Sequence, residues 1–230
     1  MKRTVVRDRA LIRLISATYH KPPSLRSLVD NDAEMEVLAR IEGLTSERRR
    51  AEEGHSLNLD SRELAWQRKH NAMAVYGNSH INAAFTYTRK GGSRFNTESR
   101  GAWYCVWDVE TAIKEVAFHR TRELAYIGVF KDNARYVELH ADFIGEFPDI
   151  TDESDHPCLN PDPAIGYLAG QKLAEELQQE GERGLIYPSV RHPGGRCLAV
   201  FDPSAIQNVR PGASWDLTWD GTHEYIVCGV

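Results

Sequence analysis

The stretch FTYTRKGGSRFNTESRGAWYCVWDVETAIKEVAFH, from Phe85 to His119, decides how the rest of the chain is organised. Its pattern predicts a strand, a glycine turn, a second strand and a helix, in that order, at Ala84–Arg89, Gly91–Gly92, Ala102–Trp107 and about Val109–Leu124. Asp108 directly precedes the helix and can accept hydrogen bonds from the free amides of its first turn, so we expect it to be the N-cap.

Strands and helices follow one another irregularly in the C-terminal half. Asp162 and Pro163 predict the start of a second helix and Gly181 its end. The turn Asp220–Gly221 indicates a hairpin between two late strands. Extended segments are expected at Tyr126–Lys131, Tyr136–His140, Leu185–Val190, Cys197–Phe201, Trp215–Trp219 and Glu224–Cys228. Because the elements do not alternate strictly, the expected class is α+β, with mixed β-sheets and flanking helices.

Residues 1–77 are expected to be a charged N-terminal helical extension, followed by the main domain at 78–230. Helices are expected in its first residues and over Ser24–Gly43, Ser46–Glu53 and Ser61–Val75. The SERRRAEE run mixes both charges, which favours a solvated helix face over a functional basic patch. No motif ties this extension to chemistry, so it either packs on the main domain or binds a partner.

Composition limits the class of protein. The chain has 230 residues, 41% hydrophobic and 27% charged, with a formal net charge of -5. This balance predicts a globular core and counts against a nucleic-acid backbone as the main partner, which would select for excess positive charge. We see neither a signal peptide pattern nor an apolar run long enough to span a bilayer, so a cytoplasmic location without membrane contact is expected.

The sequence predicts no metal site. Its nine histidines form no HExxH pair, and its four scattered cysteines are expected to be free thiols in a reducing compartment. The acidic, proline-rich segment Asp149–Pro163 lacks the glycine and terminal glutamate of a calcium loop, which favours a solvated loop.

Two residues of the opening stretch are candidates for ligand contacts. Arg94 follows Gly91–Ser93, where glycines allow close approach to a ligand and the guanidinium can fork onto a phosphate or carboxylate. A surface salt bridge is the alternative, because GGSR matches no nucleotide-binding fingerprint. Tyr104 lies in AWYCVW, which is apolar on both faces. It is either a core aromatic or a ring that lines a cleft and stacks on a flat heterocycle.

Glu115 and Ser189 are the candidates for chemistry. Glu115 borders the apolar face of the predicted helix, so its carboxylate either pairs with a cation or belongs to a site. Ser189 lies in YPSVRHPGG, where a plain turn serine is the alternative. The sequence has no GxSxG elbow, so Ser189 is not expected to be a covalent nucleophile.

The order and spacing of these residues are more specific than any one of them. Tyr104 follows Arg94 by ten residues, Glu115 follows Tyr104 by eleven, and Ser189 follows Glu115 by 74. The segments GGSRFN, AWYCVW, ETAIKE and LIYPSVRHPGG, with CLAVFD after the last, resemble those of the RES-domain family, named for its Arg, Glu and Ser. These proteins are the toxins of bacterial Xre–RES toxin–antitoxin pairs.

The resemblance implies an ADP-ribosyltransferase-like fold and a reaction that consumes NAD without a metal. It implies a transferase acting on a protein, for example a nucleotide-synthesis enzyme such as phosphoribosyl pyrophosphate synthetase. The alternative within the family is an NAD hydrolase or phosphorylase. A non-enzymatic NAD- or protein-binding module, with Arg94 and Glu115 as a structural ion pair, is a further alternative. A nuclease toxin is a third alternative. The net charge of -5 counts against it, because a nucleic-acid backbone is itself negatively charged.

The resemblance also implies a role for each candidate residue. Arg94 would fork onto the diphosphate of NAD, with Phe95 in the same binding segment, and Tyr104 would pack against the nicotinamide end. Glu115 would hold the ribose hydroxyls and stabilise the cation that forms as nicotinamide departs. Ser189 would hydrogen-bond nicotinamide or its ribose. The implied partner is an antitoxin with a helix-turn-helix domain, which we expect to cover the cleft between Arg94 and Glu115. The acidic loop around Asp149–Asp155 and the N-terminal helices are other candidate contacts.

Overall fold

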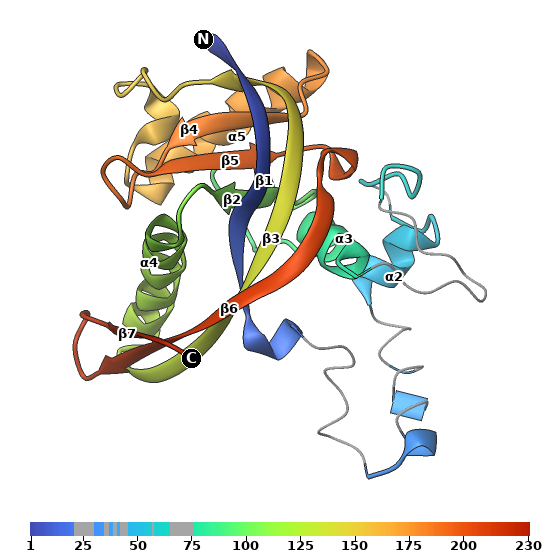
Figure 1. Cartoon of the computed structure of the whole chain (residues 1–230), viewed down its shortest axis with the longest axis vertical. Helices are drawn as coiled ribbons and strands as arrows, with labels where there is room; N and C mark the ends of the chain where they lie inside the picture. The colour runs from blue at the N-terminus through green and yellow to red at the C-terminus, as the bar shows by residue number, and fades with distance from the viewer. Residues whose placement is uncertain (21–29, 35–36, 39–40, 42–45, 57, 65–75) are drawn as a thin grey trace.

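Strand β3 (Lys131–Asp149) connects the parts of the sheet in this computed structural model, which describes residues 1–20, 30–34, 37–38, 41, 46–56, 58–64 and 76–230. Within those residues, seven strands form one sheet in the order β1-β2-β5-β4-β3-β6-β7, and β1 also pairs with β3. The first five strands in this order therefore close on themselves, while β6 and β7 extend the sheet beyond β3 (Figure 1). The other strands are β1 (Lys2–Ser16), β2 (Trp103–Val106), β4 (Gly184–Pro188), β5 (Arg196–Val200), β6 (Gln207–Asp220) and β7 (Ile226–Gly229).

Helices cover both faces of the central strands. The described helices are α2 (Glu47–Glu52), α3 (Asn78–Thr86), α4 (Val109–Ile127) and α5 (Pro163–Gln179), with short 3-10 turns at η1 (Ala17–Tyr19), η3 (Pro157–Leu159) and η4 (Pro203–Ala205). Side chains of β2 alternate between two buried clusters, as a pleated strand requires. Trp103 packs in the cluster of Phe85 on α3, whereas Tyr104 packs in the cluster of α4 and α5. The alternation therefore puts Tyr104 on the same face as α4, which carries Glu115.

The structure confirms the α+β class and most elements expected after residue 100. Strand β2 and helix α4 follow the predicted order, and the Asp108 side chain caps α4 by accepting from the Thr111 amide at 2.8 Å. Asp162 caps α5, with Pro163 in its first turn. The predicted hairpin is present as β6 and β7, and Gly221 at the turn has a φ of 89°.

The helical prediction is wrong for Lys2–Ser16, which forms β1 and pairs antiparallel with β3. A bulge between Asp8 and Leu11 shifts the register, so Val6 and Leu11 pack in the same buried cluster although they are five residues apart. A bulge adds a residue to one strand and breaks its two-residue alternation, which made this strand resemble an amphipathic helix. The start of the predicted extension is therefore part of the central sheet.

Two further segments differ from expectation. The first half of the strand predicted over Ala84–Arg89 is the end of α3, where Ile81 and Phe85 are buried at the four-residue spacing of a helix. The segment Tyr126–Lys131 begins as the end of α4, because that helix continues to a C-cap at Gly128 with φ 77°. The run Ser46–Glu53 contains α2, whereas the helices predicted over Ser24–Gly43 and Ser61–Val75 lie mostly outside the described residues.

All four cysteines are free, and three of them are buried. In the described part of the chain, none of the helices has the length and apolar character required to cross a membrane.

Candidate active site

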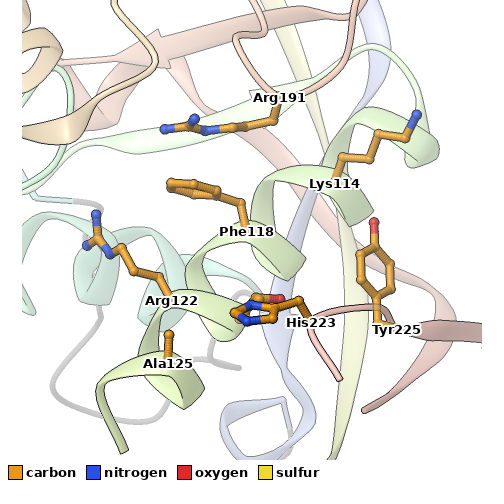
Figure 2. A pocket seen from close by; sticks show the side chains of 8 residues that line it. Lys114, Phe118, Arg122, Ala125, Arg191, His223 and Tyr225 are labelled. Carbon is orange, nitrogen blue, oxygen red and sulfur yellow. The ribbon is translucent and has the colours of Figure 1, made fainter. Parts of the chain in front are cut away.

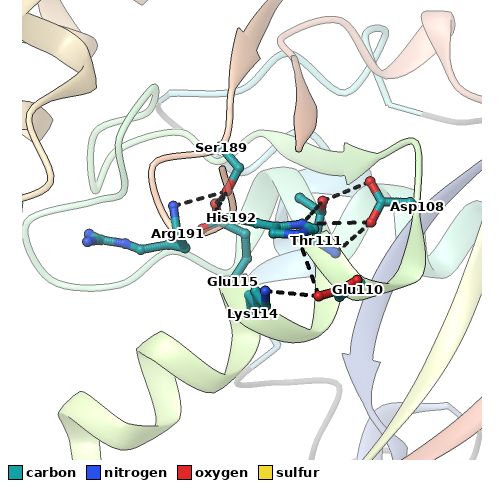
Figure 3. A network of polar contacts seen from close by, with 8 residues as sticks. All are labelled: Asp108, Glu110, Thr111, Lys114, Glu115, Ser189, Arg191 and His192. Atoms are coloured by element: carbon teal, nitrogen blue, oxygen red, sulfur yellow. Dashed lines mark hydrogen bonds and ion pairs between the residues drawn. The ribbon is translucent and has the colours of Figure 1, made fainter. Parts of the chain in front are cut away.

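A hydrogen-bonded serine–glutamate pair lies at the centre of the candidate site (Figure 3). Glu115 projects from the second turn of α4, and Ser189 directly follows β4. The Ser189 hydroxyl donates to Glu115 Oε1 at 2.6 Å and accepts from the amides of Arg191 at 3.1 Å and His192 at 3.0 Å. Because two backbone donors approach the Ser189 oxygen, its proton is directed to the carboxylate.

The Glu115 carboxylate lies in a partly desolvated position. Burial raises its pKa above the ordinary value of 4.5, against the Ser189 hydrogen bond and the nearby charges of Arg191 and Arg94, which lower the pKa. Desolvation destabilises the charged form of an acid, so the net shift means that burial is the stronger effect. A poorly hydrated carboxylate interacts strongly with positive charge that develops beside it.

A second set of contacts fixes the loop after Ser189 to the start of α4. The Thr111 hydroxyl donates to Asp108 Oδ2 at 2.8 Å and lies 2.8 Å from His192 Nδ1. His192 Nε2 also lies 3.5 Å from Glu110, which pairs with Lys114 at 2.9 Å. Figure 3 shows this network beside the Ser189–Glu115 pair. It holds the two segments that supply the pair at a fixed separation.

Arg94 is buried, with only 7% of its surface exposed. Its Nη1 donates to the carbonyl of Cys158 and to that of Asn160, the latter at 2.9 Å, and its guanidinium lies 5.5 Å from the centre of the Tyr167 ring. The loop predicted to be merely solvated thus supplies carbonyl acceptors to the site, and its Cys158 is fully buried. The predicted contact of Arg94 with a diphosphate stays a prediction.

Tyr104 and Phe95 hold the segment that carries Arg94. The Tyr104 hydroxyl accepts from the Phe95 amide and donates to Asn96 Oδ1, both at 2.9 Å. Burial raises the Tyr104 pKa, so this phenol is neutral at physiological pH. The Phe95 ring is fully buried and packs edge-on against Tyr187 with ring centroids 4.6 Å apart. These contacts are structural, and the predicted contacts of both residues with NAD stay predictions.

Several ionisable neighbours of Glu115 were not among the site residues predicted from the sequence. Arg191 lies close enough to lower the Glu115 pKa, and its Nη2 donates to the Pro161 carbonyl at 2.7 Å. His119, one turn after Glu115 on α4, has its pKa lowered to about 3 by burial and then by four nearby arginines. The signal was available in the sequence, since His119 and Arg122 follow Glu115 at spacings of four and seven residues, which share a helix face.

Comparison with known proteins gives the family. No curated protein sequence matches the chain significantly. The sequence profile of the RES domain matches residues 63–220, which include Arg94, Tyr104, Glu115 and Ser189. This match covers more than half of the chain and agrees with the α+β fold. The chain belongs to the RES-domain family.

Proposed function

We propose that this protein is the toxin of a bacterial toxin–antitoxin pair that cleaves the nicotinamide–ribose bond of NAD and transfers ADP-ribose to a protein. Toxin–antitoxin pairs are the known context of RES domains, and the family points to an NAD-related enzyme. The observation that carries the proposal is the desolvated Glu115 carboxylate, oriented by the Ser189 hydroxyl at 2.6 Å.

The reaction needs little acid–base chemistry. Nicotinamide is bound to the ribose as a pyridinium, so when the C1′–N bond breaks both electrons go to the ring and a neutral leaving group departs. The ribose becomes an oxocarbenium-like cation, which an acceptor nucleophile attacks at C1′ with loss of its proton. An enzyme of this kind accelerates the step by stabilising the cation more than the ground state.

The site supplies suitable groups for that task. One oxygen of Glu115 accepts from Ser189, which leaves the other oxygen to interact with the cation or a ribose hydroxyl. Glu115 can also accept the proton of the incoming nucleophile, because burial raises its pKa and makes it a stronger base than a solvated carboxylate. Tyr104 and Phe95 support the Arg94 segment, and we propose that Arg94 faces the phosphates when a dinucleotide displaces its carbonyl partners.

The proposed macromolecular partners are a cognate antitoxin with a helix-turn-helix domain and a protein acceptor. An antitoxin that covers the cleft between Arg94 and Glu115 would prevent NAD from reaching the carboxylate. We propose a nucleotide-synthesis enzyme, such as phosphoribosyl pyrophosphate synthetase, as the kind of acceptor. Cytoplasmic action is part of this proposal.

Nicotinamide release from NAD by the purified protein tests the chemical step. Glu115→Ala should lower the rate by about 100-fold or more, as removal of one electrostatic stabiliser typically does. Glu175→Ala removes an exposed acid on α5 and should leave the rate unchanged. Equal rates of nicotinamide release in Glu115→Ala and the wild type would contradict the proposal.

The fate of labelled ADP-ribose separates the proposed transferase from an NAD hydrolase or phosphorylase. With wild-type protein, labelled NAD and a bacterial lysate, we expect label on a protein band that is absent with Glu115→Ala. Label found only in free ADP-ribose or its phosphate ester would assign the hydrolase or phosphorylase instead. Tight NAD binding without turnover would indicate a non-enzymatic binding module.

A further inference from the structure

A cavity of about 420 Å³ lies beside the serine–glutamate pair, between α4, the loop after Ser189 and the turn between β6 and β7. A cavity of this size is large enough for part of a nucleotide. The residues that give it its chemical character are Lys114, Phe118, Arg122, Arg191, His223 and Tyr225 (Figure 2). We call it the α4 pocket.

The α4 pocket is lined by three cationic side chains and by no carboxylate. Lys114 is partly neutralised by Glu110 at 2.9 Å. Arg122 and Arg191, by contrast, have no acidic partner within salt-bridge distance among the residues that the structure describes. Arg120 on the same helix shows the usual arrangement, because it pairs with Asp132 at 2.7 Å and Glu123 at 3.2 Å.

Phe118 holds the two unpaired guanidinium groups. The Arg191 guanidinium carbon lies 3.4 Å from the centre of the Phe118 ring, and that of Arg122 lies 5.8 Å from it. Figure 2 shows both side chains extending towards this ring from different segments of the chain. Stacking on an aromatic face leaves the N–H groups at the edge of a guanidinium available for an anion. One N–H of Arg191 donates to the Pro161 carbonyl, so others remain for a ligand.

The α4 pocket adjoins the proposed reaction centre, because Arg191 lines the pocket and also contacts Ser189. Phe118 and Arg122 follow Glu115 on α4 by three and seven residues, so the three side chains lie along one side of the helix. Arg191 links the two regions, because its amide donates to Ser189 and its side chain lines the pocket. One turn after Glu115, the buried Nδ1 of His119 has no hydrogen-bond partner among the described residues, and Arg122 and Arg191 are among the charges that act on this ring.

We propose that the α4 pocket is a phosphoryl-binding subsite, with Arg122 and Arg191 as its anion-binding residues. The subsite would hold phosphate charge about two helical turns from the Glu115 carboxylate, in addition to the phosphate contact proposed for Arg94, while Glu115 would stabilise the positive ribose. This inference deepens the proposed function and takes from it the identity of the ligand as a dinucleotide. The unpaired arginines point to a phosphoryl group whether or not the chain turns over NAD.

The test measures binding of ADP, inorganic phosphate and nicotinamide riboside by calorimetry. Arg122→Gln should weaken ADP binding by about tenfold or more, since it removes a charge-assisted contact, and should not change nicotinamide riboside binding. In the NAD assay it should raise KM by a similar factor and change kcat less. Arg7→Gln is the matched control, because Arg7 is exposed on β1 and the charge change is the same.

Unchanged ADP and phosphate affinities in Arg122→Gln, with the variant folded by circular dichroism, would overturn the subsite. If that variant does not fold, Arg191→Gln carries the same test at the second proposed anion-binding residue, and unchanged ADP affinity there is equally contrary. Inorganic phosphate could bind the wild type in competition with ADP and lose this binding in the variant. That result would identify free phosphate as an occupant of the subsite. If ADP binds and inorganic phosphate does not, the occupant is the phosphoryl part of a dinucleotide. Arginine-dependent ADP binding without nicotinamide release would retain the subsite and reject the proposed function.

Discussion

Glu115 is held in an environment that costs stability and favours the proposed chemistry. Its carboxylate is mostly removed from water, and a neutral hydroxyl rather than a cation is its direct hydrogen-bond partner. Arg191 and Arg94 act on it, but their effect on its pKa is smaller than that of burial. Acids whose pKa is raised by burial are often found at functional sites, where stability is exchanged for reactivity.

Glu115→Gln should therefore stabilise the protein while it removes activity. The folded-state pKa of Glu115 is above the unfolded value, so its contribution to stability is present below the unfolded pKa of about 4.5 and is lost as pH rises through the folded pKa. Glutamine has no such titration and can still accept from Ser189. The difference in Tm between the variant and the wild type should grow from pH 4 to pH 7. It should grow by about 2–4 °C for each kcal/mol by which the variant's free energy of unfolding exceeds that of the wild type.

Thermal unfolding followed at several pH values measures this difference. Glu175→Gln, at an exposed position, should show no such trend. A wild type that is more stable than Glu115→Gln at pH 7 would contradict the argument from burial.

Helix α5 owes its position at the site to two glycines spaced one turn apart. A Cβ at Gly166 would lie 2.3 Å from the Asn160 carbonyl oxygen and 2.5 Å from Arg94 Nη1, and one at Gly170 would lie 2.2 Å from the Arg94 carbonyl oxygen. Neither position allows a side chain without movement of the helix. The glycines therefore let α5 approach the Arg94 backbone and close over its guanidinium.

Gly170→Ala should destabilise the protein although alanine is the better helix former. In an isolated helix the change would stabilise by about 1 kcal/mol, but here the overlap should cost more and give a net loss of about 1–3 kcal/mol. Chemical denaturation measures the net free energy. Gly145→Ala is the control, because its Cβ would lie 3.4 Å from the Phe147 ring, an ordinary contact. A Gly170→Ala variant more stable than the wild type would show that α5 can move away from Arg94 without cost.

The ring of five strands makes β1 part of the core of the whole molecule. Strand β1 pairs with β3 from Lys2–Asp149 to Ser16–Tyr136 and contacts β2 through Ile12 and Val106. Its Val6 and Leu11 are each 2% exposed. Without β1, β2 and β3 would each lose a strand that pairs with one of their edges, and β2 carries Tyr104 into the site.

Adjacent valines on β1 test this arrangement. Val6 is 2% exposed and Val5 is 61% exposed, because successive side chains point to opposite faces of a strand. Val6→Asp buries an unpaired carboxylate and should lower the free energy of unfolding by more than about 3 kcal/mol. Val5→Asp should change it by less than about 1 kcal/mol. Similar effects of the two changes in urea denaturation would mean that β1 does not pack as described.

The sequence by itself determined the features that depend on neighbouring residues. Asp108 and Asp162 mark the starts of α4 and α5 because a cap is a contact across two or three residues. The order of Arg94, Tyr104, Glu115 and Ser189 gave the family, which the RES profile confirms. The β6–β7 hairpin followed from its Asp–Gly turn in the same way.

Only the tertiary structure decided the features that depend on distant pairing. The bulge in β1 hides a strand inside an apparently helical pattern, and pairing with β3, far away in the chain, selects the strand. The carbonyl partners of Arg94 lie 64 and 66 residues away, and Ser189 lies 74 residues from Glu115. Local preferences are worth tenths of a kcal/mol for each residue, whereas burial and pairing act on many residues at once and override them.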